Sequence, residues 1–251
     1  MDSSETIIES VQGTIKVVTY NKPKRKNAID FDMYKRVTRI LNDGANDSNV
    51  SMMVFTGAGD YFSSGNDLVA LRTAHTPSFL TVLHDFIEAF ITFPKLLVAV
   101  VNGPAVGIAV TTLPLCDLVF AAENAFFYTP FGKLGITAEG CSTFTFPRII
   151  GYGKALEMLV FNQKMNAKEA LNYGLVNCVY KPEEVQTKVW NKLVEMSNVS
   201  NDLLTTTKRL MRSSIQDKLL KVNDEEIRLL NEAWSSRESS ENNSDTVKSK
   251  I

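Results

Sequence analysis

Two apolar runs in the first half of the chain each lead into a polar turn that contains glycine. The run MMVFTG at 52–57 precedes YFSSGNDL at 61–68, and LLVAVV at 96–101 precedes NGPAVGI at 102–108. Short apolar runs bounded by turn residues are typical of buried strands. Glycine allows the tight turns in which backbone N–H groups approach a ligand. The chain therefore repeats a strand followed by a glycine loop, and two such loops could together bind one carbonyl oxygen.

Composition excludes several classes of protein. The 251 residues are 44% hydrophobic and 22% charged, and the formal net charge is −1, which is unlike a basic nucleic-acid binder. The longest apolar stretch is interrupted by Asn102, Gly103, Pro104 and Gly107, so we expect strand, loop and helix there and no membrane span.

Cysteine and histidine usage gives no sign of a metal site or a disulfide framework. Cys116, Cys141 and Cys178 lie far apart and form no CxxC pair. His75 and His84 stand in polar or helix-like sequence, and we interpret them as surface or partly buried residues. We therefore expect a reducing compartment and no metal.

The order of elements predicts an α/β protein. Residues 6–20 form two β-branched runs separated by Gln12-Gly13, as in a hairpin. Helical spacing of apolar residues follows at 31–47, and again at about 78–93 before Pro94. Beyond Gly140 the chain is mainly helical, and the stripe from Leu219 to Trp234 could pack on the core or on a second subunit.

Four segments in a fixed order resemble the crotonase (enoyl-CoA hydratase/isomerase) superfamily over roughly residues 5–235. These are NKPKRKNAI, VFTGAGDYFSSGNDL, AVVNGPAVG and CDLVFAAENAFFYTPFGKLGI. The segment LGITAEGCSTFTFP is most similar to the peroxisomal Δ3,Δ2-enoyl-CoA isomerases. That group often carries an N-terminal acyl-CoA-binding domain, for which we expect no room here.

The resemblance implies a spiral of ββα units followed by helices that form trimers or dimers of trimers. The implied boundaries are 1–200 for the core, 201–236 for the helical trimerisation region and 237–251 for a flexible tail. It also implies that the N–H groups of Asn66 and Ile108 form an oxyanion hole for a thioester. We expect the substrate to be bound by Ser64, Gly65, Asn66, Asp67, Leu68, Gly107, Ile108, Phe131, Lys24 and Arg25.

The number and position of the carboxylate residues distinguish hydratases from isomerases in this superfamily. Hydratases of the superfamily use two glutamates, and Thr111 and Phe131 stand at those positions here. The isomerase motif places its base at Glu139, which would move a proton from C2 to C4 of a 3-enoyl-CoA without a cofactor beyond the CoA of the substrate. Phe127, Phe131, Phe144 and Phe146 could surround it and raise its pKa.

Other residues have simpler interpretations. We expect Asp67 to hold its loop by hydrogen bonds to backbone amides, and Asp117 and Glu123 to be structural or exposed. Lys22, Lys24, Arg25 and Lys26 could meet CoA phosphates or form a solvated turn. The final Ser249-Lys250-Ile251 resembles the S-K-L peroxisomal signal, and the acidic N-terminus does not resemble a signal or transit peptide.

Two other functions stay open at this point. One is a different crotonase-type reaction on an acyl-CoA, because the oxyanion hole is common to the superfamily. The other is a non-catalytic acyl-CoA-binding protein that retains the two glycine loops but has no enzymatic activity.

Overall fold

A six-stranded layer, parallel except for its first pair, forms the main sheet. The computed structural model describes residues 5–67 and 77–248. Within these ranges the strand order is β1-β2-β3-β4-β6-β9, and Gly13 makes the turn of the predicted hairpin between antiparallel β1 and β2. The strands are β1 (Ile7–Gln12), β2 (Ile15–Tyr20), β3 (Met52–Gly57), β4 (Leu96–Val101), β6 (Leu118–Ala122) and β9 (Cys178–Tyr180).

A smaller layer brings the two glycine loops together. It contains β5 (Ala105–Val106), β7 (Phe126–Tyr128) and β8 (Met165–Asn166) in the order β5-β7-β8. Single bridges pair Ser63 with Ala105 and Ile29 with Asn66. The segments that follow β3 and β4 are therefore neighbours, as two loops that share a ligand must be.

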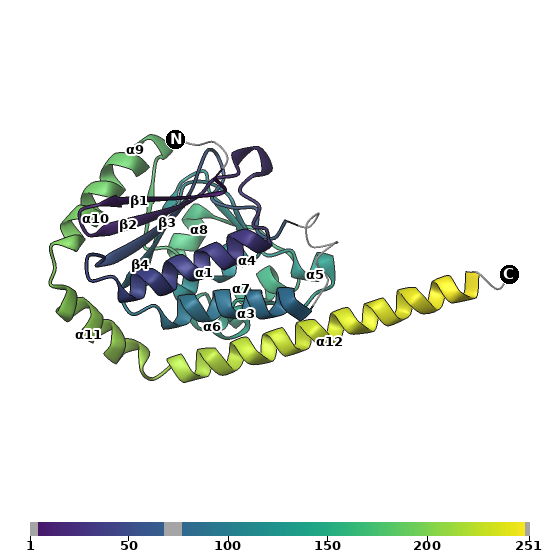
Figure 1. Cartoon of the computed structure of the whole chain (residues 1–251). Helices are drawn as coiled ribbons and strands as arrows, with labels where there is room; N and C mark the ends of the chain where they lie inside the picture. The colour runs from purple at the N-terminus through teal and green to yellow at the C-terminus, as the bar shows by residue number, and fades with distance from the viewer. Residues whose placement is uncertain (1–4, 68–76, 249–251) are drawn as a thin grey trace.

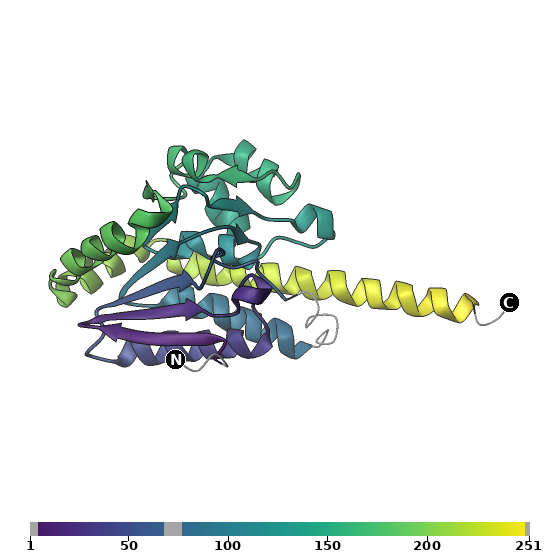
Figure 2. The ribbon, with the colours of Figure 1, turned by 90° about the horizontal axis from the view of Figure 1, so that it is seen from above.

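Helices complete the α/β fold that the sequence predicts. Helix α1 (Phe31–Asn46) begins at Asp30, whose side chain accepts a hydrogen bond from the Met33 N–H at 3.0 Å. Helix α3 (Pro77–Thr92) packs beside α1, and α12 (Gln216–Lys248) packs on α3 (Figures 1 and 2). The remaining helical segments are η1 (Pro23–Arg25), α4 (Ile108–Thr111), η2 (Leu113–Leu115), α5 (Phe131–Leu134), α6 (Ser142–Ile149), α7 (Tyr152–Leu159), α8 (Ala167–Asn172), α9 (Pro182–Glu184), the π-helical η3 (Val185–Val189), α10 (Trp190–Ser197) and α11 (Asn201–Arg212).

The first part of α12 packs on the core of its own chain. Leu219 and Leu230 are buried, and Trp234 stacks on Phe79 with ring centroids 5.9 Å apart. The sequence allows the apolar stripe from Leu219 to Trp234 to pack either on the core or on a second subunit. The structure shows it packed on the core of its own chain. Leu229, on the same helix, is more than one-third exposed.

The end of α12 is helical in the structure. The helix continues through Lys248 and projects beyond the protein body (Figure 1), and the flexibility predicted for residues 237–251 stays a prediction. No glycine or proline interrupts residues 216–248, so nothing in the sequence ends the helix where its apolar periodicity stops. The tripeptide Ser249-Lys250-Ile251 lies outside the described residues.

Asp117 is structural, as predicted, because it joins α11 to the main sheet. Its carboxylate accepts hydrogen bonds from the Leu97 N–H at 2.8 Å, from Lys208 at 2.7 Å and from Arg212 at 3.2 Å. The pairing of a half-buried carboxylate with two cations offsets the cost of removing it from water. No helix in the described part of the chain is long and apolar enough to cross a membrane.

Candidate active site

A buried asparagine holds the first glycine loop. Asn27 is fully buried, and its side-chain N–H₂ donates to the carbonyl oxygens of Ala58 at 2.9 Å and Tyr61 at 2.7 Å. The Ser63 hydroxyl donates back to the Asn27 carbonyl at 2.8 Å, and the Ser64 N–H donates to the Lys26 carbonyl at 2.8 Å. These bonds fix the path of the loop before it reaches Gly65.

Glycine is required where the two loops touch. Gly65 has φ +76°, and a Cβ at this position would lie 2.5 Å from the carbonyl oxygen of Val106. The Val106 N–H donates to the Ser63 carbonyl at 2.9 Å, which joins the loops directly. A side chain at residue 65 would force them apart.

The amides that follow the two glycines are not used elsewhere. Asn66 follows Gly65, and Ile108 is the first residue of α4, after Gly107. In the described ranges, neither the Asn66 nor the Ile108 N–H donates a hydrogen bond to a protein group. Buried N–H groups are almost always paired. Two unused donors on adjacent loops therefore indicate a site for an acceptor from outside the chain.

Glu139 lies beside the second loop. Its side chain is buried, with the residue only 3% exposed, and its Oε1 has no hydrogen-bond partner among the described residues. The next residue, Gly140, packs so closely on the end of α4 that a Cβ there would lie 2.3 Å from the Thr111 Oγ1. The segment carrying Glu139 thus contacts the short helix that begins at Ile108.

Burial makes Glu139 a much weaker acid than a solvated glutamate. Removal from water, with a smaller contribution from the negative charge of Glu226, raises the pKa of Glu139 to about 8. Burial, and after it the charge of Glu139, raises the pKa of the Tyr34 phenol. The Tyr34 hydroxyl donates to the Asn66 side-chain oxygen. Tyr34 on α1 therefore holds the Asn66 side chain of the first loop.

The predicted phenylalanines are all buried. Phe127, Phe144 and Phe146 belong to the same core cluster as Tyr34 and Ile108. Phe131 is the buried first residue of α5. All four side chains are thus removed from water, as the prediction of an apolar pocket requires.

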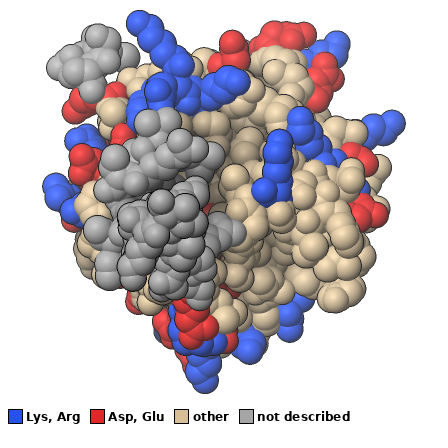
Figure 3. All heavy atoms as spheres, turned by 90° about the vertical axis from the view of Figure 1, so that its right-hand side faces the viewer, with Lys and Arg blue, Asp and Glu red and all other residues tan. Residues whose placement is uncertain are grey.

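The basic turn before α1 is tied to the first loop by ion pairs. Asp67 lies 3.1 Å from Arg25 and 3.4 Å from Lys22, so it holds its loop through the two cations. The Arg25 side chain is 55% exposed, and Lys24 is also exposed, which leaves both accessible to an anion. Figure 3 shows Lys and Arg side chains interspersed with Asp and Glu along the upper edge of the face towards which α12 projects. The predicted Leu68 lies outside the described residues.

Two cavities border other parts of the fold. One of about 400 Å³ lies against Thr137 and Ala138, and its lining includes Leu156 and Leu159 of α7. Another, of about 720 Å³, lies between the main sheet and α10, and its lining includes none of the three predicted catalytic residues.

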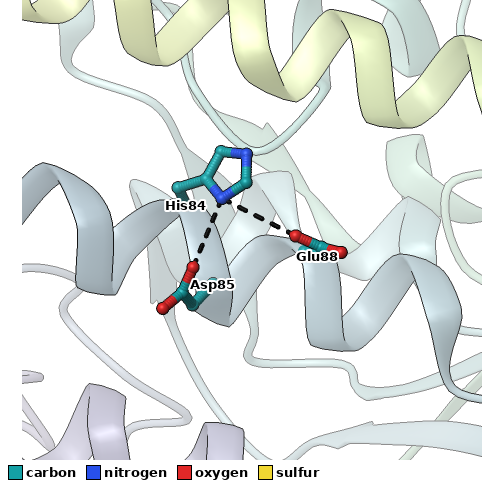
Figure 4. A group of neighbouring side chains, drawn as sticks. All are labelled: His84, Asp85 and Glu88. Carbon is teal, nitrogen blue, oxygen red and sulfur yellow. Dashed lines mark hydrogen bonds and ion pairs between the residues drawn. The ribbon is translucent and has the colours of Figure 1, made fainter.

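His84 has a structural role in the described part of the chain. Its Nδ1 faces Asp85 at 3.4 Å and Glu88 at 3.7 Å on α3 (Figure 4), and its Nε2 lies 2.9 Å from Asp224 on α12. Burial lowers the pKa of His84, but the hydrogen bonds to Asp224 and Asp85 outweigh it and raise the pKa above 6.5. A protonated His84 would join α3 to α12.

The structure joins the loops of Asn66 and Ile108, packs Gly140 beside Glu139 against α4, and adds residues that the sequence does not single out. Asn27 and Tyr34 appear in the sequence only as part of a basic turn and of a helical stripe. Glu226 belongs to an ordinary acidic run on a helix. No local sequence pattern marks these three residues as functional, because their roles come from contacts between segments that are distant in the sequence.

Known proteins share this fold and much of this sequence. The chain matches the family described as "Enoyl-CoA hydratase/isomerase" over residues 10–246. It superposes on a crystal structure of an enoyl-CoA hydratase/isomerase from Pseudoalteromonas atlantica T6c with a TM-score of 0.85 and 26% identity, covering 91% of each chain.

Two curated relatives are more similar in sequence. "Enoyl-CoA delta isomerase 2" of Rattus norvegicus is 43% identical over 241 residues, covering 94% of this chain and 61% of the relative. "Enoyl-CoA delta isomerase 3, peroxisomal" of Mus musculus is 44% identical over 231 residues, covering 90% of this chain and 72% of the relative. The chain thus spans about 61% of the length of the rat protein.

Proposed function

Because the chain belongs to the enoyl-CoA hydratase/isomerase family, we propose that it is a Δ3,Δ2-enoyl-CoA isomerase of unsaturated fatty acid β-oxidation. The single observation that carries the proposal is Glu139, a buried carboxyl group with an unpaired oxygen beside two unused backbone amides. The names of the rat and mouse relatives support the reaction class.

In the proposed mechanism, Glu139 is the only proton carrier. Its carboxylate removes a proton from C2 of a 3-enoyl-CoA, and the electron pair moves onto the thioester to form a dienolate. The Asn66 and Ile108 N–H groups stabilise the negative oxygen, and α4 adds the positive end of its short dipole. The protonated Glu139 then returns the proton to C4, which leaves the double bond between C2 and C3.

The surroundings of Glu139 support isomerisation over hydration. The superfamily's hydratase glutamates correspond here to Thr111 and Phe131, neither of which can carry a proton as a carboxylate does. Thr111 packs against Gly140, the residue after Glu139. The Glu139 carboxylate would therefore occupy the space beside α4 that a carboxylate at residue 111 would occupy in a hydratase. A single base that both takes and returns a proton suits a 1,3-shift.

The basic turn supports recognition of the CoA end of the substrate. Lys24 and Arg25 are exposed, and Arg25 is anchored by Asp67, which immediately follows the proposed oxyanion amide. A guanidinium held in this way can pair with a phosphate oxygen without leaving the loop. The same ion pairs would couple CoA binding to the position of Asn66.

The proposal is tested by incubating the intact chain with a 3-enoyl-CoA and following absorbance of the conjugated 2-enoyl-CoA. We expect isomerisation to exceed hydration of a 2-enoyl-CoA by at least about a hundredfold, because only one carboxylate is positioned as a base. Hydration at a comparable rate would favour another crotonase-type reaction. Tight acyl-CoA binding without turnover at any chain length would favour a non-catalytic binding protein.

We extend the proposal to a peroxisomal location, read by an import receptor from Ser249-Lys250-Ile251. The printed name of the mouse relative supports it. Deletion of these three residues from a fluorescently labelled chain is expected to disperse the protein into the cytosol, whereas Ile251→Leu is expected to keep it in peroxisomes. Unchanged peroxisomal fluorescence after the deletion would contradict this signal.

A further inference from the structure

A second buried carboxyl group reaches the segment that carries Glu139. Glu226, on α12, is 3% exposed. Its Oε2 accepts the Cys141 N–H at 2.7 Å, and its Oε1 accepts the Thr143 N–H at 3.1 Å and the Thr143 hydroxyl at 2.6 Å. The carboxylate thereby satisfies N–H groups at the start of α6 that have no partner within that helix.

These bonds stabilise an unusual turn. Gly140 and Cys141 have φ +71° and +59°, so two consecutive residues after Glu139 are left-handed. A non-glycine residue such as Cys141 rarely adopts this conformation. The Cys141 N–H is held by Glu226, and its Sγ lies 3.4 Å from the Leu219 carbonyl, also on α12. Helix α12 therefore supports the turn that places Glu139.

Glu226 also places a negative charge near Glu139. It has no ion pair with a Lys, Arg or His side chain within the described ranges, and its ionised form is stabilised by three hydrogen bonds. Burial raises its pKa to about 7, against the lowering effect of the Thr143 and Cys141 bonds. The negative charge of Glu226 in turn raises the pKa of Glu139, which lies near 8.

The other titratable groups around the pair stay neutral in the pH range where Glu139 loses its proton. Burial raises the pKa of the Tyr34 phenol on α1 and of the Cys141 thiol on the turn. On α3, His84 directs its ring to Asp224 on the surface side of α12, while its carbonyl accepts from Asn223. The charge that faces Glu139 from within the protein is therefore that of Glu226.

We infer that Glu226 is a positioning residue for the base: from α12 it fixes the turn that presents Glu139, and it places a carboxylate on that turn. The inference rests on the proposed role of Glu139. Glu226 acts through the turn, because both of its oxygens already accept hydrogen bonds from the protein.

The kinetic test is a pH profile of isomerisation for Glu226→Gln. Loss of the charge should move the midpoint of the rise in kcat to lower pH, by about one unit. We also expect kcat on the plateau to fall about tenfold with KM changed less than about twofold, since the base is weaker and less firmly held. An unchanged midpoint would overturn the inference. The matched control is Glu225→Gln on the same helix, an exposed residue paired with Arg228, which should leave the profile unchanged.

A second readout needs no turnover, so it separates this inference from the proposed function. The Glu139 carboxyl can be titrated by infrared spectroscopy and assigned by subtracting the spectrum of Glu139→Gln. Its midpoint should be lower in Glu226→Gln than in the wild type, and equal midpoints would overturn the inference even if the protein proves inactive.

Thr143→Val provides a second variant for this test in case Glu226→Gln does not fold. It removes only the hydroxyl that donates to Glu226 at 2.6 Å, which raises the pKa of Glu226 and leaves less charge facing Glu139. The Glu139 midpoint should then shift in the same direction by a smaller amount. No shift in a folded Thr143→Val protein would contradict the inference.

Discussion

Glu139→Gln is expected to lower kcat for isomerisation at least about a hundredfold, because glutamine fills the same space but cannot accept and return a proton. KM should change little, since the CoA contacts and both backbone amides are untouched. The measurement is the rate of conjugated 2-enoyl-CoA formation at saturating 3-enoyl-CoA. Turnover at the wild-type rate would show that another group is the base.

Stability provides the control for this variant. The folded pKa of Glu139, about 8, lies above the ordinary value of 4.5, so ionisation of Glu139 costs stability as the pH rises from about 4.5 to 8. Glutamine carries no charge in either state. The melting temperature of Glu139→Gln should therefore match that of the wild type near pH 4 and exceed it near pH 8. A lower melting temperature at pH 8 would mean that activity was lost through unfolding.

Gly65→Ala is expected to lower kcat/KM by about a hundredfold, which is the effect of losing one oxyanion donor. The added methyl group would lie 2.5 Å from the Val106 carbonyl oxygen, so the two loops must separate and their amides can no longer meet at one oxygen. The measurement is kcat/KM with the same 3-enoyl-CoA. Wild-type kcat/KM in a folded Gly65→Ala protein would show that the pairing of the two loops does not contribute to catalysis.

Gly13→Ala is the matched control. Gly13 has φ +60°, similar to the +76° of Gly65, but a Cβ there would meet nothing within 4 Å. Both substitutions carry the left-handed backbone cost of about 1 kcal/mol, and only Gly65→Ala adds the collision. Gly13→Ala should therefore lose a similar amount of stability from the backbone term and keep full activity.

Local patterns were sufficient for much of the fold. The predicted hairpin at 6–20, the strands at 52–57 and 96–101 and the helices near 31–47 and 78–93 are confirmed. The periodicity of each segment and the turn residues that bound it are local features of the sequence. They can be interpreted without knowing which other segments pack against it. Helix α6 was not predicted, because aromatic residues and Pro147 obscure its pattern and its start is stabilised by Glu226, far away in the chain.

The sequence alone determined the family, the two glycine loops and Glu139 as the candidate base, because each depends on residue types in a fixed local order. Only the tertiary structure decided that Gly65 contacts Val106, that Gly140 packs on Thr111 and that α12 delivers Glu226 to the turn after Glu139. The charge that acts on Glu139 comes from Glu226, which lies 87 positions further along the chain. Its effect on the pKa of Glu139 depends on distance in space, which a linear order of residues does not specify.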